Sequence, residues 1–175
     1  MQQIMAHSTA HILELGAGSG KLAVDMLTEL EALNALPDSY SILEVSADLR
    51  QRQRALMQEK LPHLFARVHW LDALPEKFSG ALIANEVLDA LPVHLIDWHN
   101  RGVQERGVVA TESGFAYATR DIADAALLAA AQNIGAPDDY QSEICLAARG
   151  LVQSLAARLE QGALLLIDYG FGASE

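Results

Sequence analysis

A glycine-rich segment near the start of the chain, ELGAGSGKLAV at residues 14–24, has the composition of a loop that holds a nucleotide-like ligand. Glycine has no Cβ atom, so the backbone can approach a ligand closely and adopt positive φ angles there. Three kinds of ligand are candidates: a nucleotide phosphate, a dinucleotide, or a nucleoside that carries no phosphate.

The spacing of the glycines argues against the first two ligands. A phosphate-binding loop needs a glycine five residues before its Gly-Lys pair and a hydroxyl residue after the lysine, but the chain has Leu15 and Leu22 there. A dinucleotide-binding loop has the spacing G-x-G-x-x-G, whereas this chain alternates Gly16, Gly18 and Gly20. A nicotinamide-dependent enzyme is therefore the weaker alternative.

Three acidic residues fit a nucleoside with a positively charged tail, the structure of S-adenosylmethionine (SAM). Glu14 precedes the glycines and suits the cationic amino-acid end, while Glu44 can accept hydrogen bonds from both ribose hydroxyls. Asp72 can accept one from the adenine amino group. A single acid could be a helix cap or a solvated loop residue, but three in this order favour the ligand. The predicted cofactor-binding residues are Glu14, Gly16, Gly18, Gly20, Glu44, Asp72 and Asn85.

Strands and helices alternate along the first half of the chain and must position these residues. An amphipathic helix follows the glycines, another begins after Ser46, and a long one is expected from Ile144 to Leu159. Alternation of this kind predicts an α/β fold with a mostly parallel sheet, helices on both faces, and a ligand at the carboxyl ends of the strands. The predicted strands are residues 11–15, 40–45, 66–71, 80–85 and 163–170.

A different pattern occupies residues 93–119, where short strand-like runs are separated by glycine-bearing turns at residues 100–102 and 112–114. We expect a small antiparallel β excursion after the fourth strand, within a single domain over residues 1–175. His94 and His99 are five residues apart in this excursion and should face opposite sides of a strand. Because the histidines show no ligand spacing, no metal site is expected.

Two further segments resemble the MidA-like family of class I SAM-dependent methyltransferases. ANEVLDALPVHLI at residues 84–96 is similar to the family's Asn/His-Glu-x-x-Asp-Ala-Leu-Pro-Val signature, and GALLLIDYGF at residues 162–171 resembles its fifth-strand signature. The resemblance implies a Rossmann-like class I methyltransferase fold and transfer of a methyl group from SAM to nitrogen. In the mitochondrial relatives, which assist assembly of respiratory complex I, the acceptor is a protein arginine. The resemblance thus implies a protein substrate, by extension a complex I subunit.

The acceptor nitrogen needs side chains that can hold a guanidinium, which is always protonated in water and must be oriented by carboxylates. Glu86 and Asp89 lie three residues apart after the fourth strand and would share a face if the segment were helical. We predict that Asn85, Glu86 and Asp89 are catalytic, with Asn85 contacting the substrate nitrogen or the cofactor. Alternatively, Asp89 caps or orients the turn before Pro92.

Asp168 and Tyr169 come after the fifth strand and are second-rank site candidates, although a buried aspartate at the end of a strand can simply bond backbone. Glu143 and Ile144 occupy the place of a Glu-Ile pair that opens a helix in the family. Glu143 is therefore expected to be a charge at a helix N-terminus, with a role as a site residue as the second interpretation.

Composition narrows the classes of partner and compartment. The net charge of −11 would repel a nucleic acid, and the one basic run, RQRQR at residues 50–54, is expected to be a solvated helix face. No apolar run is long enough to span a membrane. The single cysteine, Cys145, excludes an internal disulfide and suits a reducing cytoplasm. The family resemblance implies a cytoplasmic protein of the bacterial type, whereas the eukaryotic relatives are mitochondrial.

Members of the family extend further at both ends, and the class I sheet has strands beyond the fifth. We therefore expect a truncated domain whose fifth strand is an open edge unless a partner chain covers it. The alternative to an active arginine methyltransferase is a catalytically inactive SAM-binding or assembly-partner domain. A further alternative is a methyltransferase that acts on a small metabolite.

Overall fold

The chain divides into two compact units. The computed structural model describes residues 1–99 and 102–170. The parallel-sheet unit comprises Met1–Ala90 and the chain from Gln153 onward, and the antiparallel-sheet unit comprises Leu91–Val152. The single domain expected over residues 1–175 stays a prediction.

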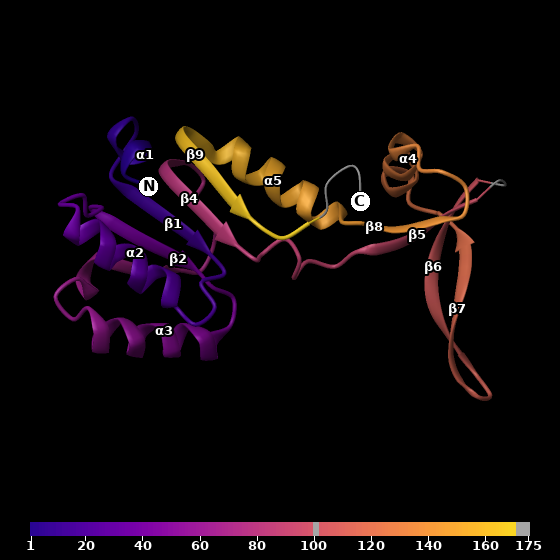
Figure 1. The fold of residues 1–175 in the computed structure, drawn as a ribbon, viewed down its shortest axis with the longest axis horizontal. Coiled ribbons are helices and arrows are strands. Elements are labelled where there is room, and N and C mark those ends of the chain that lie inside the picture. Colours follow the sequence, from indigo (N-terminus) through magenta and orange to yellow (C-terminus); the bar gives the residue numbers. More distant parts are fainter. Residues whose placement is uncertain (100–101, 171–175) are drawn as a thin grey trace. The chain divides into compact units, whose positions relative to one another are not determined.

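Five parallel strands form the first sheet in the order β3-β2-β1-β4-β9, with four of them labelled in Figure 1. This confirms the parallel sheet predicted from the alternation of elements, and it places all five carboxyl ends at one edge. The strands, in chain order, are β1 (His11–Leu15), β2 (Ser39–Leu43), β3 (Val68–Leu71), β4 (Phe78–Asn85) and β9 (Leu159–Ile167).

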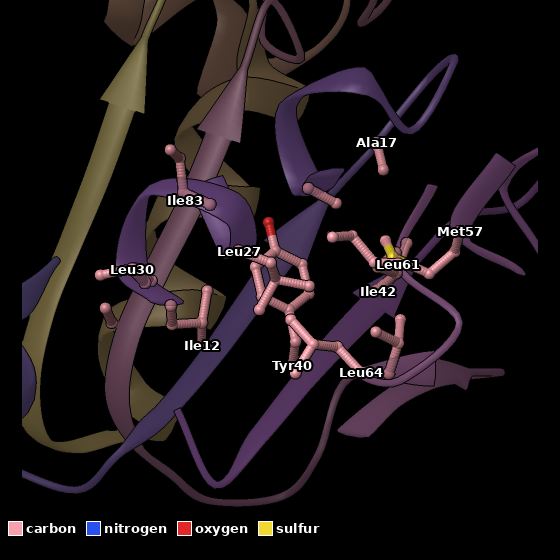
Figure 2. Close-up of a cluster of buried hydrophobic side chains, with 13 residues drawn as sticks. Ile12, Ala17, Leu27, Leu30, Tyr40, Ile42, Met57, Leu61, Leu64 and Ile83 are labelled. Carbon is pink, nitrogen blue, oxygen red and sulfur yellow. The ribbon is translucent and has the colours of Figure 1, made fainter. Parts of the chain in front are cut away.

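Helices cover both faces of this sheet, as predicted. On one face, side chains of α2 and α3 meet Tyr40 and Ile42 of β2 in a buried apolar cluster that Figure 2 shows. On the other face, Leu155 of α5 lines a small cavity together with Leu82 and Leu164. The helices of the chain are α1 (Gln2–Ala6), α2 (Lys21–Ala32), α3 (Ala47–Lys60), the short 3-10 helix η1 (Phe65–Arg67), α4 (Ala125–Ile134) and α5 (Leu146–Arg158).

The second sheet is antiparallel, with the order β7-β6-β5-β8. Strands β5, β6 and β7 form the antiparallel excursion that was predicted after the fourth strand of the chain. Strand β8 lies beyond the predicted range of residues 93–119. Helix α4 packs on one face, where Ile96 and Trp98 contact Leu127, and the indole of Trp98 donates a hydrogen bond to Ala131 O (3.0 Å). The strands are β5 (His94–His99), β6 (Gly102–Thr111), β7 (Gly114–Asp121) and β8 (Tyr140–Ile144).

Strand β8 corrects one prediction. Glu143 and Ile144 were expected to open the long helix, but they end β8, and α5 begins only at Leu146. Ile144 is buried in the apolar cluster beneath α4, and this burial outweighs the helical spacing of the residues that follow. The predicted helix also ends earlier than expected, at Arg158, because Leu159 begins β9.

Smaller predictions concern the two histidines of the excursion, one of its turns and the membrane span. His94 and His99 lie in β5 and contact the adjacent residues Glu105 and Gln104 of β6, so they face opposite sides of the sheet as expected. Residues 100–101 of one predicted turn, and Phe171 of the second family-like segment, lie outside the described residues. Among the helices described, none has the length and apolar character that a membrane span requires.

Candidate active site

The predicted site residues come together at the carboxyl edge of the parallel sheet. Each follows or ends a different strand, so the parallel topology alone brings them to one side of the molecule. Glu14 and the glycines lie at the end of β1, Glu44 directly follows β2, Asp72 follows β3, Asn85 and Glu86 lie at the end of β4, and Asp168 follows β9.

The glycine-rich loop contains one glycine that faces open space. Gly16, Gly18 and Gly20 all have positive φ (60°, 53° and 80°), and Gly20 is the N-cap of α2. A Cβ atom on Gly16 would lie 3.1 Å from Val87, and one on Gly20 would lie 3.1 Å from Gln53, whereas one on Gly18 meets nothing within 4 Å. The first and third glycines therefore serve packing, and Gly18 is where a ligand can approach the backbone.

Gln53 of α3 joins this loop to Glu44. The side chain is almost completely buried, and its Nε2 donates to Gly18 O (2.9 Å) and to Glu44 Oε2 (3.2 Å). Its Oε1 accepts a hydrogen bond from the indole nitrogen of Trp70 (2.9 Å). Gln53 was not among the predicted site residues because it lies within the basic run. Its position one helical turn before the buried Met57 is the signal that could have indicated it.

Glu44 is a buried carboxylate held in a defined orientation. Besides the contact with Gln53, its Oε1 accepts the backbone N–H of Ser46 (3.0 Å). A carboxylate offers about four lone-pair sites, so two donors leave capacity for the two hydroxyls of a ribose.

Asp72, in contrast, is an exposed carboxylate paired with an arginine. Its Oδ1 accepts from Arg50 Nη1 (2.8 Å), and Arg50 also donates to Leu71 O (2.6 Å). The expectation that residues 50–54 form a solvated face is therefore wrong for Arg50, which is partly buried, and for Gln53. The pair holds Asp72 at the end of β3, where one oxygen stays accessible.

Glu14 is buried in the sheet beneath the glycine loop. Tyr40 donates a hydrogen bond to its Oε2 (2.7 Å). Burial raises the pKa of Glu14 to about 7, the hydrogen bond from Tyr40 opposes this rise, and the negative charge of Glu44 adds to it. A positive charge bound nearby would favour the ionised form.

This raised pKa predicts a pH-dependent stability. Between pH 4.5 and about 7, Glu14 is protonated in the folded chain but ionised in the unfolded one, so the free energy of unfolding should fall as pH rises through this range. The expected contribution is about 3 kcal/mol. Urea unfolding at both ends of the range should show a smaller pH dependence for Glu14→Gln than for the unsubstituted chain. Equal dependence in the two would contradict the prediction.

Three carboxylates gather beyond β4 and β9. One oxygen each from Glu86, Asp89 and Asp168 lies within 4.8 Å of the others, close enough to hold a cation between them. Glu86 and Asp89 do not lie on a helix, because residues 86–90 form a bend and turn in which Glu86 has φ 52°. The two acids nevertheless lie close together.

Asp168 orients this turn through the backbone. Its Oδ2 accepts the N–H groups of Leu88 (3.0 Å) and Asp89 (3.2 Å), and its Oδ1 accepts that of Tyr169 (3.1 Å). The N–H of Glu86 donates to Ile167 O (2.8 Å). Backbone bonding by Asp168, one of the two roles considered for it, is confirmed.

The cluster changes the acidity of Glu86. Partial desolvation raises the pKa of its carboxyl group, and the charges of Asp168 and Asp89 raise it further. The group is therefore a better proton acceptor than an ordinary glutamate. Asn85, exposed beside it at the end of β4, can present its amide to the same space.

Comparisons with known proteins found a matching family and similar structures. The model of a family described as "Putative S-adenosyl-L-methionine-dependent methyltransferase" matches residues 1–175. An uncharacterized protein from Burkholderia thailandensis is 44% identical, with a TM-score of 0.89 over 98% of this chain and 46% of that chain. A second structure from that organism, bound to S-adenosyl-homocysteine, is also 44% identical, with a TM-score of 0.86 over 97% of this chain and 44% of that chain. The chain thus spans less than half the length of these relatives.

Proposed function

This chain belongs to the family of S-adenosyl-L-methionine-dependent methyltransferases that its sequence matches, and we propose that it binds SAM at the glycine-rich loop and methylates a protein arginine. The observation that best supports the proposal is that two groups of residues lie at the same carboxyl edge of the parallel sheet. An open glycine with an anchored acid lies at the ends of β1 and β2, and three close carboxylates lie at the ends of β4 and β9.

The residues at the first group fit the cofactor. Gly18 leaves room for the ligand, Glu44 is oriented to accept ribose hydroxyls, and Asp72 can accept from the adenine amino group. A positively charged amino-acid end bound near Glu14 favours the ionised form of its carboxyl group. When bound, SAM supplies a methyl group on an already activated sulfonium, so the chain's own task is to align donor and acceptor and to exclude water. A relative that binds S-adenosyl-homocysteine supports this assignment.

The second group fits a guanidinium acceptor. Glu86 and Asp89 can hold its N–H groups and fix which nitrogen faces the methyl donor. The methyl group would leave the sulfur of SAM, releasing S-adenosyl-homocysteine, while the nitrogen that accepts it would lose a proton. Glu86, with its raised pKa, is suited to receive that proton. Asp168 acts as a positioning residue for the turn, and Asn85 can orient the substrate from the end of β4.

The proposal extends to the partner and the compartment. We propose a protein substrate, which by family resemblance is a subunit of respiratory complex I. We also propose a cytoplasmic location in a bacterium. The second candidate is a domain that binds SAM without transferring a methyl group by itself.

The test separates binding from transfer. Calorimetry should show S-adenosyl-homocysteine binding, and Gly18→Val or Glu44→Ala should abolish it. Glu86→Gln should bind with unchanged affinity but transfer labelled methyl groups from SAM to lysate protein at least about 100-fold more slowly, because the proton acceptor and one guanidinium contact are lost. Methylarginine is then identified in the hydrolysed protein.

Glu76→Gln is the matched control for Glu86→Gln, because Glu76 is exposed in the loop that precedes β4, away from the carboxyl edge. Normal transfer by Glu86→Gln would overturn its catalytic role. Binding without methyl transfer by the unsubstituted chain would favour the second candidate, and absence of binding would overturn the cofactor assignment.

A further inference from the structure

One face of the antiparallel sheet lacks the apolar character of the other. Side chains alternate along β5, so Leu95 and Asp97 lie on the face opposite Ile96 and Trp98, which contact α4. A hollow of about 280 Å³ opens here within the antiparallel-sheet unit. The lining residues that matter for its chemistry are Leu95, Asp97, Arg106, Tyr117, Gln141 and Glu143.

Asp97, which lines this hollow, has an unsatisfied acceptor. The residue is only 8% exposed, and its Oδ2 accepts a hydrogen bond from Arg106 Nε (3.1 Å). Its Oδ1 is buried and accepts no hydrogen bond from any residue that the structure describes. A buried carboxylate oxygen without a donor is unfavourable, so a ligand that donates an N–H group there would be bound favourably.

Arg106 does not neutralise the hollow. Its guanidinium is already engaged by Asp97, by Gln141 Oε1 (3.0 Å) and by the ring of Tyr117, whose centroid is 5.2 Å away. Glu143 adds a second carboxylate, two residues along β8 from Gln141 and therefore on the same face. Two acids and one cation give the hollow a net negative charge, which favours a positively charged ligand.

We propose that this hollow binds the cationic side chain of a lysine or arginine in a polypeptide segment, with an N–H group donating to Asp97 Oδ1. Leu95 and Tyr117 provide an apolar and aromatic wall for the methylene groups of such a side chain. The hollow lies wholly within the antiparallel-sheet unit, so the proposed binding needs neither SAM nor the carboxylates at the other sheet. Its failure is thus distinguishable from a failure of the proposed methyl transfer.

The experiment is an NMR titration of the intact chain, without cofactor, with the capped peptides acetyl-Gly-Arg-Gly-amide and acetyl-Gly-Lys-Gly-amide. We expect saturable shifts of the backbone amides of Asp97, Gln141 and Glu143 with at least one of them. Asp97→Asn should weaken binding at least about tenfold, since it removes the charged acceptor. Glu143→Gln should weaken it about threefold, because this carboxylate contributes charge without the buried contact.

Two controls make the result decisive. Asp121→Asn changes an exposed carboxylate at the end of β7 that bonds Gln104, and it should leave binding unchanged. The neutral citrulline peptide should not bind. Saturable binding of the citrulline peptide with equal affinity, or no saturable shift with either cationic peptide, would overturn the proposal. If Asp97→Asn does not fold in a thermal melt, the Glu143→Gln titration decides.

Discussion

Gly162→Ala is expected to lower the free energy of unfolding by about 3 kcal/mol or more, a large part of the stability of a domain of this size. Gly162 pairs with Gly80 across strands β9 and β4. A Cβ atom on Gly162 would lie 1.9 Å from Gly80 O and 2.8 Å from its carbonyl carbon, and the residue has φ 132°. Both neighbours are backbone atoms that cannot rotate aside, so the two strands would have to separate.

Gly150→Ala is the matched control for this substitution. Gly150 is exposed in α5, and nothing lies within 4 Å of the Cβ position. Because alanine favours helix more than glycine does, this change should raise stability by up to about 1 kcal/mol. Chemical unfolding of both variants measures the difference. A Gly162→Ala midpoint equal to that of Gly150→Ala would show that the backbones of β4 and β9 are not in the close contact described.

The consequence of this contact reaches the candidate active site. Strand β9 continues from Gly162 to Ile167 and Asp168, which hold the N–H groups of the turn beyond β4. Separation of the strands would therefore loosen the carboxylate cluster as well as the sheet. Even a Gly162→Ala chain that folds at low temperature should lose order in that turn.

The parallel sheet could be predicted because its signals are local. Each strand is a short apolar run, and an acid or amide follows it, as Glu44 follows β2 and Asp72 follows β3. Parallel topology then makes the ends of distant runs neighbours without further information. The residues predicted for the cofactor and the acceptor lie at one edge for this reason, although the sequence could not establish what each one bonds.

The remaining features depend on contacts between distant segments. Ile144 has the same spacing to the following leucines whether it opens a helix or ends a strand, and only its burial beneath α4 decides between them. The turn at Glu86 and Asp89 is held by Asp168, about 80 residues later, so no local pattern could reveal its conformation. Gln53 was hidden for a similar reason, since its partners come from three other segments.

Gln53→Leu is expected to weaken S-adenosyl-homocysteine binding at least about tenfold and to lower the free energy of unfolding by about 2 kcal/mol. Leucine fills a similar volume but leaves Gly18 O, Glu44 Oε2 and the indole nitrogen of Trp70 without this partner. The glycine loop and Glu44 would then no longer be fixed relative to each other. Gln51→Leu, at an exposed position of the same helix, is the matched control and should bind normally.

Gln53→Glu distinguishes a positioning role from simple packing. The carboxylate keeps an acceptor for Trp70, but when ionised it repels Glu44 and donates nothing to Gly18 O. We therefore expect this variant to bind S-adenosyl-homocysteine better at low pH than at high pH, because protonation of the introduced carboxyl group removes the repulsion. If Gln53 only fills space, Gln53→Glu should show the same pH dependence of binding as the unsubstituted chain, and Gln53→Leu should bind normally once folded.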